Sequence, residues 1–108
     1  AHFVDIKEVD LSGVSGLSSL CVQEILMSCI NLETLHLKNC NLEQLQITGN
    51  YPNVTDMDIS YSQLKAKNLE NFLLCFPNIQ KLSIASLHFP TFQSLRNFPF
   101  LTDLDISQ

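Results

Sequence analysis

The chain has 108 residues, 45% of them hydrophobic and 16% charged, which is ordinary for a single globular domain. Eleven acidic residues against six basic ones give a net charge of −5, which disfavours binding to phosphate backbones or anionic membranes and favours basic partners. Apolar runs such as Phe72–Phe76 are far shorter than the roughly 20 residues that span a bilayer. We therefore expect neither nucleic acid nor a membrane as partner.

A repeated apolar pattern organises the chain. The stretch Leu32–Leu42 fits L-x-x-L-x-L-x-x-C-x-L at every fixed position. The first part of this pattern recurs, so that five units begin near residues 6, 32, 54, 79 and 101. The units are 22 to 26 residues apart, within the roughly 20 to 29 residues typical of leucine-rich repeats. The apolar positions of the other four units are Ile6-Val9-Leu11, Val54-Met57-Ile59, Ile79-Leu82-Ile84 and Leu101-Leu104-Ile106.

The residues just before four of the units also align without gaps. A large or apolar residue comes first, and proline is second in three of the four cases, where it ends a helix and favours extended backbone. These junctions are Cys29-Ile30-Asn31, Tyr51-Pro52-Asn53, Phe76-Pro77-Asn78 and Phe98-Pro99-Phe100. They predict that a strand follows each of them.

Two intervals between the units predict helices with apolar stripes at i, i+3, i+4 and i+7. The stripes are Val22, Ile25, Leu26, Cys29 in the first and Leu69, Phe72, Leu73, Phe76 in the second. Ser18 or Ser19 is placed to cap the first helix, and Asn68 or residues 65–67 to open the second. The shorter intervals, 43–50 and 91–97, predict only a helical turn or a short helix.

Strands that alternate with helices predict an α/β leucine-rich repeat solenoid of about five repeats. Short parallel strands would line its concave face, and helices or helical turns its convex face. We expect residues 1–108 to form one such domain. Neither end resembles the polar cap that closes a solenoid, so we also expect the domain to be a fragment of a longer array.

Side chains beside the second and third apolar positions of each unit are predicted to point away from the core, because side chains alternate along a strand. The first column of such residues is Glu8, Thr34, Asp56, Lys81 and Asp103. The second column is Asp10, His36, Asp58, Ser83 and Asp105, and the third is Ser12, Lys38, Ser60, Ala85 and Ser107. Six of the eleven acidic residues fall on this face.

A surface of one predominant charge steers an oppositely charged ligand toward it. We therefore predict that this face binds a protein through a basic or Lys/Arg-containing segment. The candidate partner-binding residues are Glu8, Asp10, His36, Lys38, Asp56, Asp58, Lys81, Ser83, Asp103 and Asp105.

No pattern of catalytic, metal-binding or cofactor-binding residues accompanies this face. Asp10, His36 and Asp58 share a column and could hold a metal only if they converged, and nothing supplies further ligands; partner contact or a solvated polar face are the other interpretations. His36 and Cys40 are expected on opposite sides of the sheet, which argues against a nucleophilic pair. The glycines form no nucleotide-binding motif. We expect a non-enzymatic protein without a cofactor.

The four cysteines contain no C-x-x-C pair that would indicate zinc or a redox dithiol. Cys29 and Cys40 occupy interior positions of the pattern, which favours free thiols in a reducing compartment, while Cys21 and Cys75 lie off the helical stripes. Leu87, His88, Phe89 and Phe92 form an apolar cluster that we interpret as core.

The run Cys29–Cys40 resembles the cysteine-containing leucine-rich repeats of F-box-type substrate receptors, whose typical run is C-P-N-L-x-x-L-x-L-x-x-C. The junctions at residues 51–54 and 76–79 look like variants of it. The resemblance implies an intracellular array, cytoplasmic or nuclear, that recruits substrates to a cullin-type ubiquitin ligase. Binding to the ligase adaptor would then use sequence outside this chain.

Ribonuclease-inhibitor-like arrays use related units, and a fold alone does not choose among functions. A non-enzymatic scaffold, or a regulatory or receptor-type binding domain, is therefore the alternative, and an extracellular location stays open with it.

Overall fold

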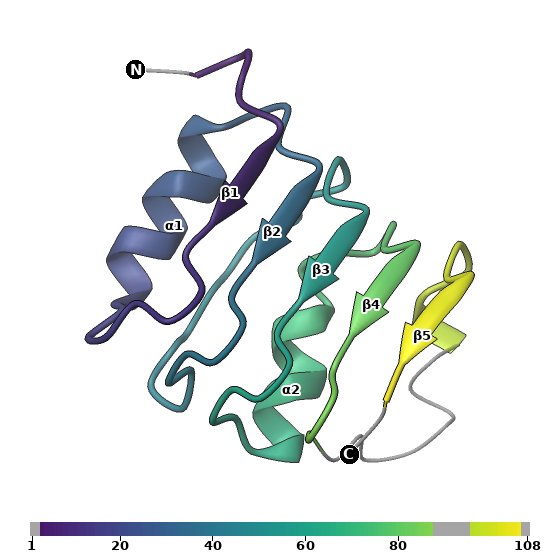
Figure 1. Ribbon diagram of the computed structural model, residues 1–108. Coiled ribbons are helices and arrows are strands. Elements are labelled where there is room, and N and C mark those ends of the chain that lie inside the picture. Colours follow the sequence, from purple (N-terminus) through teal and green to yellow (C-terminus); the bar gives the residue numbers. More distant parts are fainter. Residues whose placement is uncertain (1–2, 88–95, 107–108) are drawn as a thin grey trace.

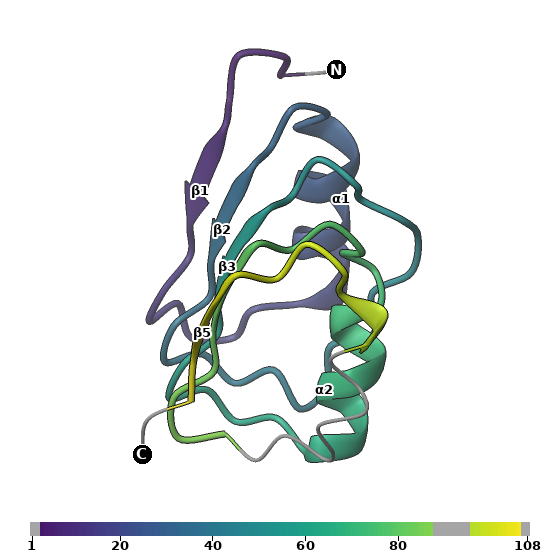
Figure 2. The same cartoon turned by 90° about the vertical axis from the view of Figure 1, so that its right-hand side faces the viewer.

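The computed structural model describes residues 3–87 and 96–106, which form a small α/β domain (Figure 1). Five strands make one open sheet and two helices lie behind it. The strands are β1 (Glu8–Asp10), β2 (Thr34–His36), β3 (Asp56–Asp58), β4 (Lys81–Ser83) and β5 (Asp103–Asp105), and the helices are α1 (Ser19–Ser28) and α2 (Ala66–Leu73). Figure 2 shows both helices on the same side of the sheet, so that its other face carries no helix.

All five strands are parallel, follow one another in sequence order and share one register. Glu8 lies opposite Thr34 and Asp10 opposite His36, and every later pair of strands continues the same alignment. The first two columns predicted from the sequence are therefore confirmed as rows that run across the sheet.

The two helices form where the apolar stripes predict them. The Ser18 side chain caps α1 by accepting a hydrogen bond of 3.1 Å from the N–H of Cys21. Lys65 precedes α2 without a side-chain cap. Val22, Leu26, Leu69 and the rest of the second stripe are buried, so each helix packs the expected face toward the sheet.

The predicted stretch 43–50 begins with a hydrogen-bonded turn at residues 42–45 and contains no helix. Of the two predicted alternatives, a helical turn or a short helix, the short helix does not form, because side chains of α1 bind this segment in another conformation. Ser19 Oγ donates to the carbonyl of Gln44 (3.3 Å) and accepts from the N–H of Gln46 (2.8 Å). The Gln23 amide pairs with both the N–H and the carbonyl of Thr48.

In the last interval, residues 96–97 form a short 3-10 turn, and residues 91–95 lie outside the described part of the chain. Leu87 is buried, as predicted, while His88, Phe89 and Phe92 of the same predicted cluster lie outside the described residues.

The core fills the space between sheet and helices. Aliphatic side chains from successive strands stack in rows, and Phe72 and Tyr51 both pack against Phe76, with ring centroids 5.3 Å and 5.8 Å from it. The fully buried members include Leu35, Leu37, Leu42, Ile59, Leu82 and Ile84. Cys29 and Cys40 are buried, as predicted, and Cys75 is buried too, so it packs in the core although it lies off the helical stripe.

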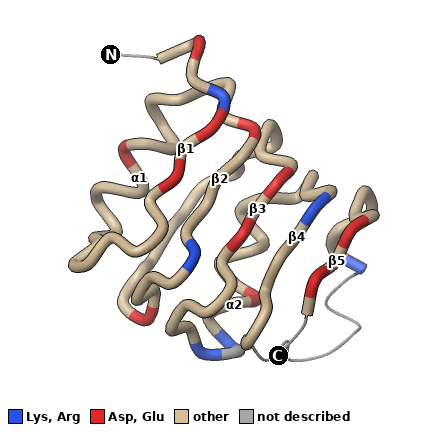
Figure 3. Tube along the Cα trace, in the orientation of Figure 1, with Lys and Arg blue, Asp and Glu red and all other residues tan. Residues whose placement is uncertain are grey.

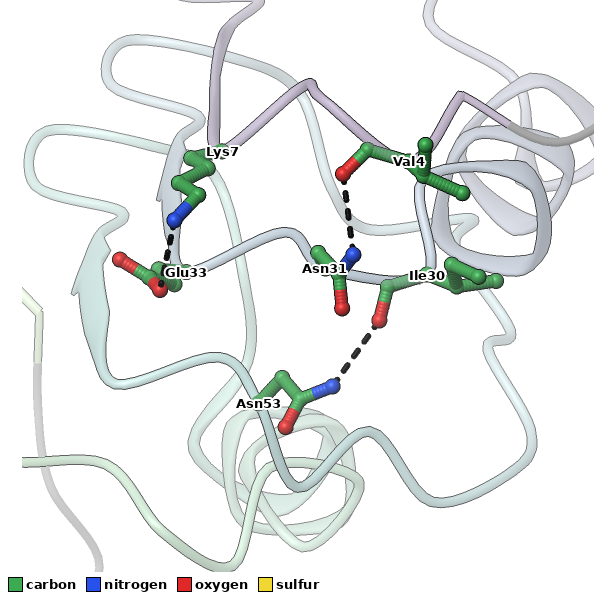
Figure 4. Close-up of polar contacts among 6 residues, drawn as sticks. All are labelled: Val4, Lys7, Ile30, Asn31, Glu33 and Asn53. Carbon is green, nitrogen blue, oxygen red and sulfur yellow. Dashed lines mark hydrogen bonds and ion pairs between the residues drawn. The ribbon is translucent and has the colours of Figure 1, made fainter.

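Asparagines at three junctions join successive units, and Figure 4 shows the first two of them, Asn31 and Asn53. Each side-chain amide donates a hydrogen bond of 2.9 Å to a backbone carbonyl two residues before the start of the preceding unit: Asn31 to Val4, Asn53 to Ile30 and Asn78 to Pro52. Phe100 stands at the corresponding position of the last junction and cannot continue the row. The Lys7 ammonium lies 4.0 Å from the Glu33 carboxylate on the same rim of the sheet.

Substitution of Ser62 tests how much its two buried hydrogen bonds contribute to stability. Its hydroxyl accepts from the N–H of Cys40 (3.0 Å) and donates to the carbonyl of Leu37 (2.7 Å). Ser62→Ala leaves both buried groups without a partner, so we expect it to lower the free energy of unfolding by about 1–3 kcal/mol in urea denaturation. The control is Ser15→Ala at an exposed position; equal effects of the two variants would contradict this role.

Candidate functional site

The helix-free side of the sheet is the candidate site, and we call it the open face. Its first row is Glu8, Thr34, Asp56, Lys81 and Asp103, and its second row is Asp10, His36, Asp58, Ser83 and Asp105. Figure 3 shows acidic residues on β1, β3 and β5. The structure thus brings together nine of the ten candidate residues; Lys38 follows β2 at the carboxyl rim.

Acidic and non-acidic strands alternate on the open face. Each of β1, β3 and β5 carries two carboxylates, whereas β2 and β4 carry none. Neighbouring strands are roughly 4.8 Å apart, so carboxylates of one row stand about 10 Å apart. Since like charges directly opposite each other destabilise a sheet, the alternation lets the face hold six acidic residues.

Two of these carboxylates also stabilise the turns that follow their strands. Asp10 Oδ1 accepts from the N–H of Ser12, and Asp58 Oδ1 accepts from the N–H of Ser60, both at 2.9 Å. Hydrogen bonds from the Ser12 hydroxyl and N–H lower the pKa of Asp10, and the electrostatic interaction with His36 also lowers it. The repeated pattern Asp-apolar-Ser is the sequence signal of this arrangement, and it recurs at residues 105–107.

In the third predicted column, Ser12 and Lys38 are exposed as predicted, whereas two other members are not. Ser60 and Ala85 are buried, and the Ser60 hydroxyl accepts from the N–H of Ala85 at 3.0 Å. Ser12 accepts from the N–H of Lys38 in the same way (3.0 Å). The prediction of outward side chains is wrong for Ser60 and Ala85 because the strands are three residues long, and their alternation ends before this position. Ser107 lies outside the described residues.

His36 does not join Asp10 and Asp58 in one cluster. Its Nε2 instead lies 3.5 Å from the Glu8 carboxylate, diagonally across the strands. No group of three or more His, Cys, Asp or Glu residues in the described part of the chain could hold a metal ion. Cys40 is buried, and its thiol donates to the carbonyl of Leu11 (3.3 Å).

The carboxyl rim of the sheet carries a feature that the sequence reasoning missed. In four successive units, the residue three positions after the last residue of the strand has a left-handed backbone. These residues are Gly13, Asn39, Tyr61 and Ser86, with φ between 56° and 77°. A groove of about 490 Å³ is lined by the first three of them together with Ser12 and Lys38. The Lys38 ammonium lies 5.6 Å from the centre of the Tyr61 ring.

Two other positions are weaker candidates for a binding or reactive site. A groove of about 640 Å³ follows the asparagine row at the amino rim, where the amides already bind the preceding junction. Burial raises the pKa of the Cys75 thiol, which disfavours the reactive thiolate.

No protein-family model, curated protein sequence or solved structure matches this chain significantly. None of the described helices has the length and apolar character that crossing a membrane requires. The geometry of the open face is therefore the basis for a functional assignment.

The hydrogen bonds between Ser12 and Asp10 predict that the stability of the folded state depends on pH. Because folding lowers the pKa of Asp10, its ionised form stabilises the folded state above the usual carboxyl pKa. This contribution is lost as the pH falls through the folded-state pKa. Ser12→Ala removes the largest cause of the shift, so an NMR titration of the Asp10 carboxyl should give a higher pKa in this variant. An unchanged pKa in Ser12→Ala, or an equal rise in Ser15→Ala, would contradict the assignment.

Proposed function

We propose that this chain is a leucine-rich repeat solenoid whose open face binds another protein. The parallel strands in sequence order, their single register and the helices confined to one side support this architecture. So does the L-x-x-L-x-L pattern, whose apolar positions in the three central units are buried. In such a solenoid the open face is the concave surface.

The alternation of acidic and non-acidic strands carries the proposed binding function. It gives the face three pairs of carboxylates at regular spacing, separated by the non-acidic residues of β2 and β4. A basic or Lys/Arg-containing segment of a partner protein fits this pattern of charge. The proposal is a binding function without catalysis.

Substrate recognition within a ubiquitin ligase is our first choice of biological role. The resemblance of residues 29–40 to the repeats of F-box-type receptors supports it, with an intracellular location and an adaptor contact outside this chain. A scaffold, or a regulatory or receptor-type domain, would use the same face. Identification of the bound protein separates these roles.

The proposal predicts that charge reversal on the open face abolishes capture of the partner. Asp56 and Asp103 are suitable because neither caps a turn in the described structure, and we expect Asp56→Lys/Asp103→Lys to lower recovery at least about tenfold at low salt, by loss of complementary charge. The measurement is affinity capture with this chain as bait, followed by mass spectrometry.

The matched control is Glu24→Lys/Glu43→Lys, which changes the net charge equally at exposed positions off the open face. Equal recovery with both double variants would refute binding through the open face. Recovery of a protein that is a ubiquitin-ligase substrate would favour the substrate-receptor role, and recovery of a receptor or signalling complex the alternative.

A further inference from the structure

Tyr61 is an anomaly at the carboxyl rim. The equivalent positions hold glycine, asparagine and serine, whereas Tyr61 places a bulky side chain on a backbone with φ of 59°. A left-handed conformation is unfavourable for such a residue. Residues held in this way concentrate at functional sites, where the surrounding structure keeps them in place.

Packing of the ring does not explain why a tyrosine stands here. Tyr61 is 52% exposed, and its hydroxyl has no hydrogen-bond partner among the described residues. Tyr51 shows the contrast, because its ring packs on Phe76 and its hydroxyl donates to the carbonyl of Thr48 at 2.7 Å. Tyr51 contributes to the fold, whereas Tyr61 presents its aromatic surface to solvent.

The Tyr61 ring already has a cation beside it. The Lys38 ammonium lies 5.6 Å from the ring centre and forms no ion pair with a described carboxylate. Two carboxylates belong to the turns beside this groove: Asp58 caps the turn that leads into Tyr61, and Asp10 caps the turn of Ser12, which lines the groove. The face of an aromatic ring attracts cations, and the acidic residues of the neighbouring open face favour the approach of a basic ligand.

We propose that the Tyr61 ring is the docking site for an arginine side chain of the partner protein, and that Lys38 occupies this place in the free protein. The inference rests on the proposed function, because it names the anchor of the same basic segment. Arginine fits better than lysine, since a planar guanidinium can stack on the ring while its edge binds a carboxylate. The partner's arginine displaces the Lys38 ammonium, which moves into solvent.

Peptide binding tests the inference with a defined probe. A fluorescently labelled hexa-arginine peptide is titrated with the chain at low salt, and anisotropy gives the affinity; hexa-lysine is the comparison. We expect hexa-arginine to bind more tightly, Tyr61→Asn to weaken its binding about tenfold, and Tyr61→Phe to retain it. Lys38→Met should strengthen binding several-fold because it removes the competing cation.

Thermal unfolding separates a binding role of Tyr61 from a structural one. Asparagine tolerates the left-handed backbone, so Tyr61→Asn should keep or raise the melting temperature while it loses affinity. The matched control is Ser86→Asn, which changes the equivalent position of the next unit outside the groove and should leave peptide binding unaltered.

Several results would overturn the inference: no binding of hexa-arginine to the wild-type chain, unchanged affinity in Tyr61→Asn, a lowered melting temperature in that variant, or weaker binding in Lys38→Met. If Asp56→Lys/Asp103→Lys abolishes peptide binding while Tyr61→Asn does not, the open face remains the binding surface and only the arginine site fails. If Tyr61→Asn abolishes peptide binding but charge reversal leaves protein capture intact, the proposed function of the open face fails instead.

Discussion

A repeated backbone interaction at the amino rim determines the arrangement of the whole domain. The carbonyl of the residue before each of the first four strands accepts two N–H groups from the next unit: Lys7 binds Glu33 and Thr34, and Glu33 binds Thr55 and Asp56. The carbonyls of Thr55 and Gln80 each accept two N–H groups from the following unit in the same way. A slip by one residue would turn every core side chain to the other face, so these bonds and the buried rows maintain the same register.

Once the register is set, electrostatics limits what the open face can carry. Aligned strands place equivalent residues roughly 4.8 Å apart, and carboxylates on all five strands would repel along both rows. Thr34 and His36 on one strand, and Lys81 and Ser83 on another, interrupt that repulsion. The charge pattern therefore satisfies a requirement of the fold as well as the proposed binding function.

Much of the fold could be predicted because its determinants are local. The alternation around Leu35 and Met57 indicates strands, and Ser18 before an apolar stripe indicates the start of a helix. The conformation of residues 43–50 depends on Gln23, which lies far away in the sequence. Tyr61 escaped prediction because its left-handed backbone follows from its place in the register, and tyrosine gives no local signal of it.

The open face and the carboxyl rim are connected through Asp10. Its carboxylate binds the N–H of Ser12, and the Ser12 hydroxyl accepts from the N–H of Lys38, whose ammonium reaches the Tyr61 ring. The residue that supplies charge to the face therefore also fixes the backbone that carries the rim cation. Such fixed geometry lowers the entropy lost on binding, because less of the protein has to become ordered. The structural role and the proposed binding role thus coincide in the same carboxylate.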